Sequence, residues 1–135
     1  MKTEGVDVVA VISYQDLMVW KKAMKLAKNV YCLARKLPQE EKYALSDQMR
    51  RAVVSIPANI AEGQSRRTTK DFVHFLYIAK GSNAELMTHL ILCHSFEYIP
   101  TKEFQTVKKQ SDEVGMLLNL LIRSLEKKNI KAVVK

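Results

Sequence analysis

Apolar residues recur every three or four positions between Ser46 and Arg67, and this spacing constrains the fold more than any other feature of the chain. The residues in this register are Met49, Ala52, Val53, Ile56 and Ile60. On an α-helix, which has about 3.6 residues per turn, they form one apolar stripe. We therefore expect this stretch to be a helix that packs one side against a core.

A second stripe, made of polar residues, follows one edge of the apolar stripe at about 100° per residue. We call it the polar edge of this helix, and its members are Gln48, Arg51, Ser55, Asn59 and Glu62. Polar groups in such a position can bond to a neighbouring helix without being fully buried. We expect them to hold the helix in register with that neighbour.

Two residues modify the expected course of this helix. Pro57 lies inside the helical pattern, where it removes the hydrogen bond to the Val53 carbonyl and crowds that turn, so we expect a kink. Gly63 offers a natural stop for the helix. A basic connection, Gln64–Arg67, follows it.

The first helix is expected to begin at Tyr14 or Gln15 and to end at Leu37, because Pro38 follows. Its predicted core seam is Leu17, Trp20, Met24, Ala27, Tyr31 and Ala34. A second apolar strip on this helix comprises Val19, Ala23, Leu26, Val30, Leu33 and Leu37. A helix that its own bundle covers on one side needs something else to cover a second strip. We expect that cover to be another subunit or the rest of a wide core.

The third helix is predicted to follow Thr68, a good N-cap with Asp71 in the capping-box position, and to extend to about Ser95. Its predicted core stripe is Phe72, Phe75, Ala79, Asn83, Leu86, Leu90 and Cys93. A second apolar side comprises Val73, Tyr77, Met87 and Ile91. Two long helices with two apolar sides each exceed what four helices can cover, so we expect a homo-oligomer.

The third helix also has a polar edge, which consists of Asp71, Ser82, Glu85 and His89. We expect the two polar edges to meet, with Glu85 as the partner of Arg51 or Asn59. Such contacts would fix the register of the two helices, and this structural interpretation is favoured over a catalytic one.

The last helix is expected to begin after Thr101, its N-cap, and to end near Lys127 or Lys128. Its apolar face comprises Phe104, Val107, Val114, Leu117, Leu118, Leu121, Ile122 and Leu125. The four helices predict an all-α fold, an antiparallel up-down four-helix bundle with a kink at Pro57 in the second helix.

This bundle is expected to occupy residues 14–128, between an N-terminal arm at 1–13 and a basic, frayed tail at 129–135. The apolar run at 6–12 contains Asp7 and is too short to span a membrane. A loose arm, a short strand and a remnant of cloning are all compatible with it. We expect no association with a membrane.

Three segments closely resemble the family of small four-helix-bundle proteins encoded in intervening sequences of bacterial large-subunit ribosomal RNA genes. They are YQDLMVWKKAMKLAKNVY at 14–31, QMRRAVVSIPANIAEGQSRR at 48–67 and FVHFLYIAKGSNAELMTHL at 72–90. The resemblance covers roughly residues 14–125 and implies a cytoplasmic bacterial bundle that tends to form pentamers. The related accessory proteins of diversity-generating retroelements share this architecture and work beside a reverse transcriptase and RNA.

Composition agrees with a helical globular protein. Only four Gly and three Pro occur against 47% hydrophobic residues, which suits helices better than a β-rich or disordered chain. Cys32 and Cys93 lie far apart within helical patterns, and no secretory signal precedes them. We therefore expect a reduced, cytoplasmic setting.

The residues give little support for an enzyme. The most suggestive group is Glu85 and His89, one turn apart, with Cys93 and His94 nearby. A ferritin-like metal site needs Glu-x-x-His on two helices, whereas the spacing here is Glu-x-x-x-His and occurs once. No Gly-rich phosphate loop, HExxH or G-x-S-x-G pattern is present. We expect no catalytic residue, no metal site and no cofactor.

The charge balance favours contact with a polyanion. Lys and Arg number 22 against 14 Asp and Glu, for a formal net charge of +8. In a bacterial cytosol the polyanion would be nucleic acid, although lysines that simply keep the bundle soluble would give the same balance. The candidate nucleic-acid-binding residues are Lys21, Lys22, Lys25, Lys28, Arg50, Arg66, Arg67 and Lys70. Arg51 is left out of this set because contacts within the bundle can hold its side chain.

Three functional hypotheses follow. The first is a non-enzymatic oligomeric scaffold that binds structured RNA or DNA by shape and charge. The second is a protein-interaction module, an accessory to a nucleic-acid enzyme such as a reverse transcriptase. The third is an orphan passenger of mobile DNA.

Overall fold

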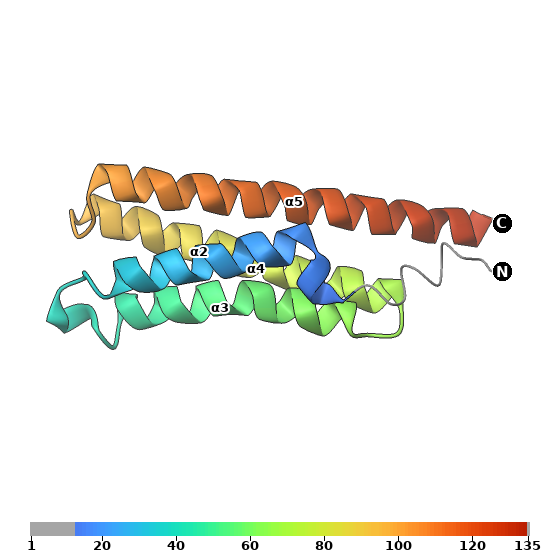
Figure 1. The fold of residues 1–135 in the computed structure, drawn as a ribbon, viewed down its shortest axis with the longest axis horizontal. Coiled ribbons are helices and arrows are strands. Elements are labelled where there is room, and N and C mark those ends of the chain that lie inside the picture. Colours follow the sequence, from blue (N-terminus) through green and yellow to red (C-terminus); the bar gives the residue numbers. More distant parts are fainter. Residues whose placement is uncertain (1–12, 135) are drawn as a thin grey trace.

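The computed structural model describes residues 13–134, which form four α-helices and two short 3-10 helices (Figure 1). In chain order they are η1 (Tyr14–Asp16), α2 (Met18–Ala34), η2 (Gln39–Glu41), α3 (Leu45–Gln64), α4 (Thr69–Ser95) and α5 (Thr101–Val134). This range contains no strand, and the expected all-α four-helix bundle is confirmed. Except for Ser13, the arm expected at 1–13 lies outside the described residues, and so does its apolar run.

The four helices pack as a closed square. α2 contacts α3, α3 contacts α4, α4 contacts α5, and α5 contacts α2. In Figure 1 the sequence colours advance in opposite directions along consecutive helices, which are joined end to end by short connections. The apolar core lies between the four helices and includes residues from all of them.

The apolar stripe of α3 is the best-predicted part of the core. Its members Met49, Ala52, Val53, Ile56 and Ile60 are all buried, with exposed fractions of 0–3%. Pro57 is also buried, and α3 continues through it to Gln64. The kink at Pro57 stays a prediction.

On α2 the structure reverses the expected roles of the two apolar strips. The strip that was expected to need cover from another subunit or from the rest of a wide core is the one buried in the bundle, and it comprises Val19, Ala23, Leu26, Val30, Leu33 and Leu37. In the predicted seam, Ala34 is buried and Leu17, Trp20 and Ala27 pack against the rim of the core, whereas Tyr31 is exposed. Val19, Ala23 and Leu26 are each about 200° around the helix from a lysine two residues later, so this part of the strip lies opposite the charge. Of the two covers that the sequence left open, the wide core is the one that the structure shows, and this strip needs no second subunit.

On α4 the core stripe was correct from Ala79 onward and wrong at its beginning. Leu76 is fully buried, whereas Phe72 and Phe75 are only partly so. The alternation of threes and fours through Ala79 continues backward to Leu76, which makes Leu76 the core position. Thr68 caps α4 as predicted, and its side-chain oxygen accepts the Asp71 N–H at 3.0 Å.

Three helix ends differ from expectation, both ends of α2 and the end of α5. α2 begins at Met18, because Leu17 has extended backbone and separates it from η1, and it ends at Ala34. α5 continues to Val134, well past Lys128. The segment 128–134 contains no Gly or Pro, so nothing in its sequence ends the helix.

The polar edges of α3 and α4 meet as predicted, but through Ser55 and Ser82 and not through Glu85. Ser55 Oγ lies 2.8 Å from Ser82 Oγ, and the Asn59 amide donates to the Ser55 carbonyl and hydroxyl oxygens at 2.8 and 2.9 Å. Glu85 is instead 3.6 Å from His89 on its own helix. The partnership expected between Glu85 and Arg51 or Asn59 was wrong, because intrahelical partners one turn away are closer.

The other members of the α3 polar edge take similar local partners. Arg51 Nε donates to Asp47 at 3.0 Å, and Arg66 lies 2.7 Å from Glu62. Both pairs are spaced by four residues, the separation that brings side chains together on a helix. Gln48 is exposed. The edge therefore contacts α4 only over a short length around Ser55.

A reciprocal pair of hydrogen bonds joins α4 to α5 inside the core. The Asn83 amide donates to the Ser111 carbonyl at 3.0 Å, and the Ser111 hydroxyl donates to Asn83 Oδ1 at 2.8 Å. Both side chains are buried. Because a buried polar group without a partner is costly, this pair favours one register of α4 on α5.

Gly63 allows α3 and α4 to approach closely, a role different from the helix stop that the sequence indicated. It is buried within the last turn of α3. A Cβ atom at this position would lie 2.7 Å from Phe75 Cβ and 3.1 Å from the Phe72 carbonyl oxygen. The main chain of α4 and the Cβ atom of Phe75 therefore leave no room for a methyl group at position 63.

We predict that Gly63→Ala lowers the free energy of unfolding by roughly 1–3 kcal/mol, because the added methyl group overpacks this contact. Gly81→Ala is the matched control, since nothing lies within 4 Å of a Cβ there and Gly81 is also helical. It should raise stability by roughly 0.5–1 kcal/mol through helix propensity. Urea denaturation measures both, and a Gly63→Ala variant as stable as wild type would contradict the close approach.

Candidate nucleic-acid interface

The outward side of α2 carries a stripe of positive charge. Lys21, Lys25, Lys28 and Arg35 follow one another at spacings of three, four or seven residues, and all four are exposed. The stripe extends about 21 Å along the helix axis. α2 contains no Asp or Glu, so this charge is not offset within the helix itself. We call these four residues the α2 stripe.

A groove between α2 and α5 adjoins the stripe and adds a lysine that sequence analysis missed. A pocket of about 210 Å³ is lined there by Lys22, Lys25, Lys109, Gln110 and Glu113. Lys22 lies 3.5 Å from Glu113, and the nearby Asn29 amide donates to Gln110 at 3.0 Å. Lys109 becomes part of this surface only because α5 packs against α2, which its position in the sequence does not indicate.

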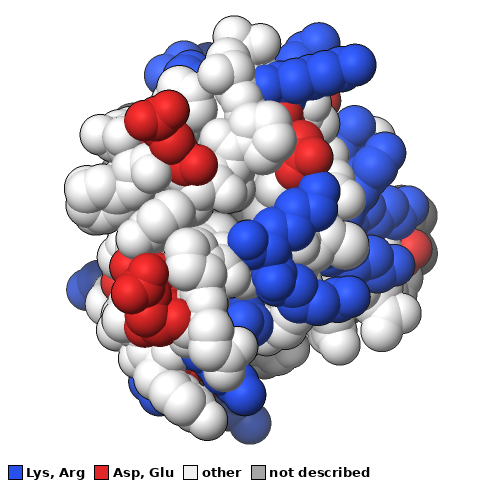
Figure 2. Space-filling model, turned by 90° about the vertical axis from the view of Figure 1, so that its left-hand side faces the viewer, with Lys and Arg blue, Asp and Glu red and all other residues white. Residues whose placement is uncertain are grey.

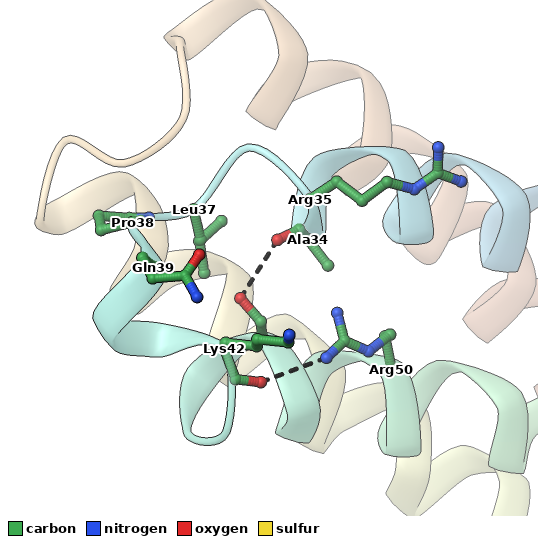
Figure 3. A pocket seen from close by; sticks show the side chains of 8 residues that line it. Ala34, Arg35, Leu37, Pro38, Gln39, Lys42 and Arg50 are labelled. Carbon is green, nitrogen blue, oxygen red and sulfur yellow. Dashed lines mark hydrogen bonds between the residues drawn. The ribbon is translucent and has the colours of Figure 1, made fainter.

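The other end of the α2 stripe leads to a second pocket, which we call the corner pocket (Figure 3). Its volume is about 350 Å³, and its lining is Ala34, Arg35, Leu37, Pro38, Gln39, Lys42, Ser46 and Arg50. Arg50 Nη2 donates to the Lys42 carbonyl at 3.3 Å, and the buried Ser46 hydroxyl donates to the Ala34 carbonyl at 3.2 Å. Arg35 and Lys42 were not among the predicted residues.

The structure separates the predicted cations into groups. Arg50 belongs to the corner pocket, at the beginning of α3, whereas Arg66 lies beyond its end, about 24 Å away along the axis. Arg67 and Lys70 are exposed near Arg66, at the connection to α4. Arg66 pairs with Glu62, and its guanidinium lies 4.8 Å from the centre of the Phe75 ring. Arg50 therefore lies apart from these three candidate residues.

Charge is also unevenly placed at the end of the bundle that contains the α2–α3 and α4–α5 connections. Figure 2 shows this end, with most Lys and Arg on one side and with Asp and Glu both on the opposite side and next to the basic residues. Local ion pairs take up some cations, as Lys36 with Glu103 at 2.8 Å. Such exposed pairs contribute little to stability, yet each carboxylate cancels the electrostatic field of its paired cation at short range.

A bond between the two connections at this end keeps one carboxylate away from the corner pocket. The Tyr98 hydroxyl donates to Glu41 Oε2 at 2.9 Å, and the Leu45 N–H donates to Glu41 Oε1 at 3.4 Å. The bond to Glu41, followed by partial burial and the negative charges nearby, raises the pKa of Tyr98 above its ordinary value of 10.0. Glu41 thus ties the α2–α3 connection to the α4–α5 turn.

Two reactive side chains, Cys93 and His89, lie where solvent has little access. Burial, with a smaller effect of the Glu41 charge, raises the pKa of Cys93 to about 11, so its thiol stays protonated at neutral pH. Cys93 Sγ lies 3.3 Å from Met49 Sδ. Both ring nitrogens of His89 are buried without a hydrogen-bond partner. Among residues 13–134, no three of His, Cys, Asp and Glu come together in a way that could hold a metal ion.

Comparison with known proteins assigns the chain to a family. The model of the 23S rRNA-intervening sequence protein family matches residues 15–120, which is most of the chain. The chain belongs to this family. The match begins in η1, includes α2, α3 and α4 whole, and ends within α5, so the α2 stripe, the groove and the corner pocket all lie inside the family's domain.

A solved structure supports the same assignment. It is a crystal structure of a protein with unknown function from the S23 ribosomal protein family of Bacteroides thetaiotaomicron VPI-5482. The two chains are 30% identical, and the TM-score is 0.73. The alignment covers 78% of this chain and 98% of the other. The search of curated proteins finds no match. No helix in the described part of this family member is both long and apolar enough to cross a membrane.

We predict that Tyr98→Phe lowers stability in a pH-dependent way. Since the folded pKa of Tyr98 is raised, its contribution is fully present below the unfolded value of 10.0 and is lost as the pH rises through the folded pKa. The free energy of unfolding of wild type should therefore exceed that of Tyr98→Phe by a constant amount from pH 7 to about pH 9, and this difference should shrink at higher pH. Denaturation midpoints across this range measure it, and an advantage that grows with pH would contradict the bond to Glu41.

Proposed function

We propose that this protein is a non-enzymatic, cytoplasmic, oligomeric scaffold that binds nucleic acid, most favourably structured RNA, along α2. The observation that supports this most is the α2 stripe, four exposed cations on a helix without a single carboxylate. The groove adds Lys22 and Lys109 on one flank, and the corner pocket adds Lys42 and Arg50 at one end. The basic surface thus extends beyond one helix face.

The dimensions of this surface suit a nucleic-acid backbone. Duplex DNA carries one negative charge for about every 1.7 Å of its axis, so an array 21 Å long faces several phosphates at once. Binding releases condensed counterions, which makes the affinity depend steeply on salt. Lysine and arginine contacts to phosphates position a nucleic acid without reading its sequence.

Two further points favour RNA of defined shape. The family is described by its relation to 23S rRNA, which places its coding sequence beside a structured RNA. Trp20 and Phe72 pack against the core and are not free to stack on unpaired bases, whereas Tyr31 and Tyr43 are exposed. A rigid basic rod therefore fits recognition of a helical backbone better than recognition of bases.

Apolar side chains on α4 and α5 support an oligomer and keep a second function under consideration. Tyr77, Ile91, Met116 and Leu120 are each about half exposed, although they are large and apolar. Such side chains are common where another chain is bound. We propose that they contact further copies of this chain. Contact with a different protein, such as a nucleic-acid enzyme, is the second candidate function.

The α2 surface can be tested with two triple variants of equal charge. Lys21→Gln, Lys25→Gln and Lys28→Gln together should weaken binding to a short RNA duplex and reduce the slope of log K against log salt by about 2.7, since each lost phosphate contact accounts for about 0.9. Arg66→Gln, Arg67→Gln and Lys70→Gln remove the same charge at the other end of α3. Fluorescence anisotropy at several salt concentrations measures both.

The two triple variants separate the possible outcomes. The proposal expects a clearly larger loss for the α2 variant. Equal losses would mean that only net charge matters, and a larger loss for the Arg66 group would move the interface to the α3–α4 connection. Binding that does not depend on salt, or no binding at low salt, would contradict a charge-based interface altogether.

The oligomer can be tested by placing negative charges at its proposed apolar contacts. Met116→Glu with Leu120→Glu should reduce the light-scattering mass of an oligomer to that of one chain, because burying two carboxylates in an interface is costly. Met18→Glu is a control, since Met18 is equally exposed and apolar but lies on α2. A wild-type protein with the mass of a single chain would contradict the oligomer.

A further inference from the structure

The corner pocket collects positive charge and hydrogen-bond donors without a carboxylate. Of its lining residues, Arg35, Lys42 and Arg50 are cationic and none is Asp or Glu. In Figure 3 the Lys42 ammonium and the Arg50 guanidinium lie on the same side of the pocket, whereas the Arg35 guanidinium points away along α2. Lys42 and Arg50 therefore form the charged centre, and Arg35 lies at the rim.

Arg50 is held in place by the protein itself. Its Nη2 donates to the Lys42 carbonyl oxygen at 3.3 Å, which fixes the guanidinium over the α2–α3 connection. A guanidinium has five N–H donors, so most of them remain for a ligand. The Gln39 amide, which lines the same pocket, adds neutral donors. Planar N–H donors arranged in this way suit two oxygens of one anion.

The carboxylates closest in sequence are already engaged elsewhere. Glu41, next to Lys42, accepts from the Tyr98 hydroxyl and from the Leu45 N–H. Asp47, which follows Ser46, pairs with Arg51 at 3.0 Å. In residues 13–134 no carboxylate lies in an ion pair with Lys42 or Arg50. Two neighbouring cations without a counter-charge repel each other, and a bound anion removes that cost.

We propose that the corner pocket is a binding site for a phosphate group, which Arg50 holds by paired N–H donors and Lys42 and Gln39 hold by single ones. A pocket of about 350 Å³ is at the small end of ligand sites, so it takes a small anion or one phosphate of a larger ligand. This site deepens the proposed function and rests on it where the phosphate belongs to a nucleic acid, because the corner pocket lies at one end of the same basic surface. The phosphate can be free or part of a nucleic acid.

Equilibrium dialysis of the full chain with radiolabelled inorganic phosphate at low ionic strength tests the site. One phosphate should bind per chain. Lys42→Gln and Arg50→Gln should each weaken binding about tenfold, the effect of losing one charge-assisted hydrogen bond. Arg123→Gln is the control, because it removes the same charge from an exposed position on α5 and should leave binding unchanged.

Lys42→Gln separates loss of the site from loss of the fold. The Lys42 side chain is exposed and makes no intramolecular hydrogen bond within the described residues, so this variant should fold normally. Thermal unfolding of each variant is measured in parallel. Equal weakening by Arg123→Gln would overturn the site, because only overall charge would then matter. Phosphate binding that neither Lys42→Gln nor Arg50→Gln reduces would overturn it as well.

Competition with two short single-stranded RNAs of one sequence identifies the source of the phosphate. If only the 5′-phosphorylated RNA displaces inorganic phosphate, the pocket takes a terminal or free phosphate. If the 5′-hydroxyl RNA displaces it equally well, the pocket takes a backbone phosphate. The triple Lys21, Lys25 and Lys28 variant should retain inorganic phosphate binding, so failure of the α2 interface and failure of the corner pocket give different results.

Discussion

The burial of one apolar strip on α2 determines where the positive charge of the molecule lies. Val19, Ala23 and Leu26 are fixed in the core between α3 and α5, and a lysine follows each of them by two residues. Two residues correspond to about 200° around a helix, so inward burial of the strip forces the lysines outward. The same hydrophobic burial that stabilises the bundle thus produces its basic surface.

Each of the four helix interfaces also contains a polar contact, and these contacts add direction to an otherwise apolar core. They are Ser46 to the Ala34 carbonyl between α2 and α3, Ser55 to Ser82 between α3 and α4, Asn83 with Ser111 between α4 and α5, and Asn29 to Gln110 between α2 and α5. Apolar side chains can slide past one another at small cost, whereas a displaced polar pair leaves buried groups unbonded. The buried contacts, Ser46 to the Ala34 carbonyl and Asn83 with Ser111, thereby favour one register at their interfaces.

The sequence was sufficient for the helices, for the α3 core and for the meeting of two polar edges. Prediction from the sequence failed where two packing arrangements of a helix were compatible with the same local pattern. Both apolar strips of α2 have helical spacing, and only packing against α3 and α5 selects one. Gly63 illustrates the same limit, because its role depends on Phe75, which α4 brings to it. Lys109 joins Lys22 and Lys25 through the α2–α5 contact, and local patterns cannot indicate such a surface.

The distribution of acids explains why the net charge is not spread evenly. Glu62, Asp47 and Asp112 pair with cations four residues away on their own helices. Glu103 and Glu113, both on α5, pair with Lys36 and Lys22. These pairs are exposed and add little stability, but they neutralise the cations they contact. Lys21, Lys25 and Lys28 have no such partner among the described residues. The excess charge of the chain is therefore concentrated on α2, where a polyanion can approach without displacing a carboxylate.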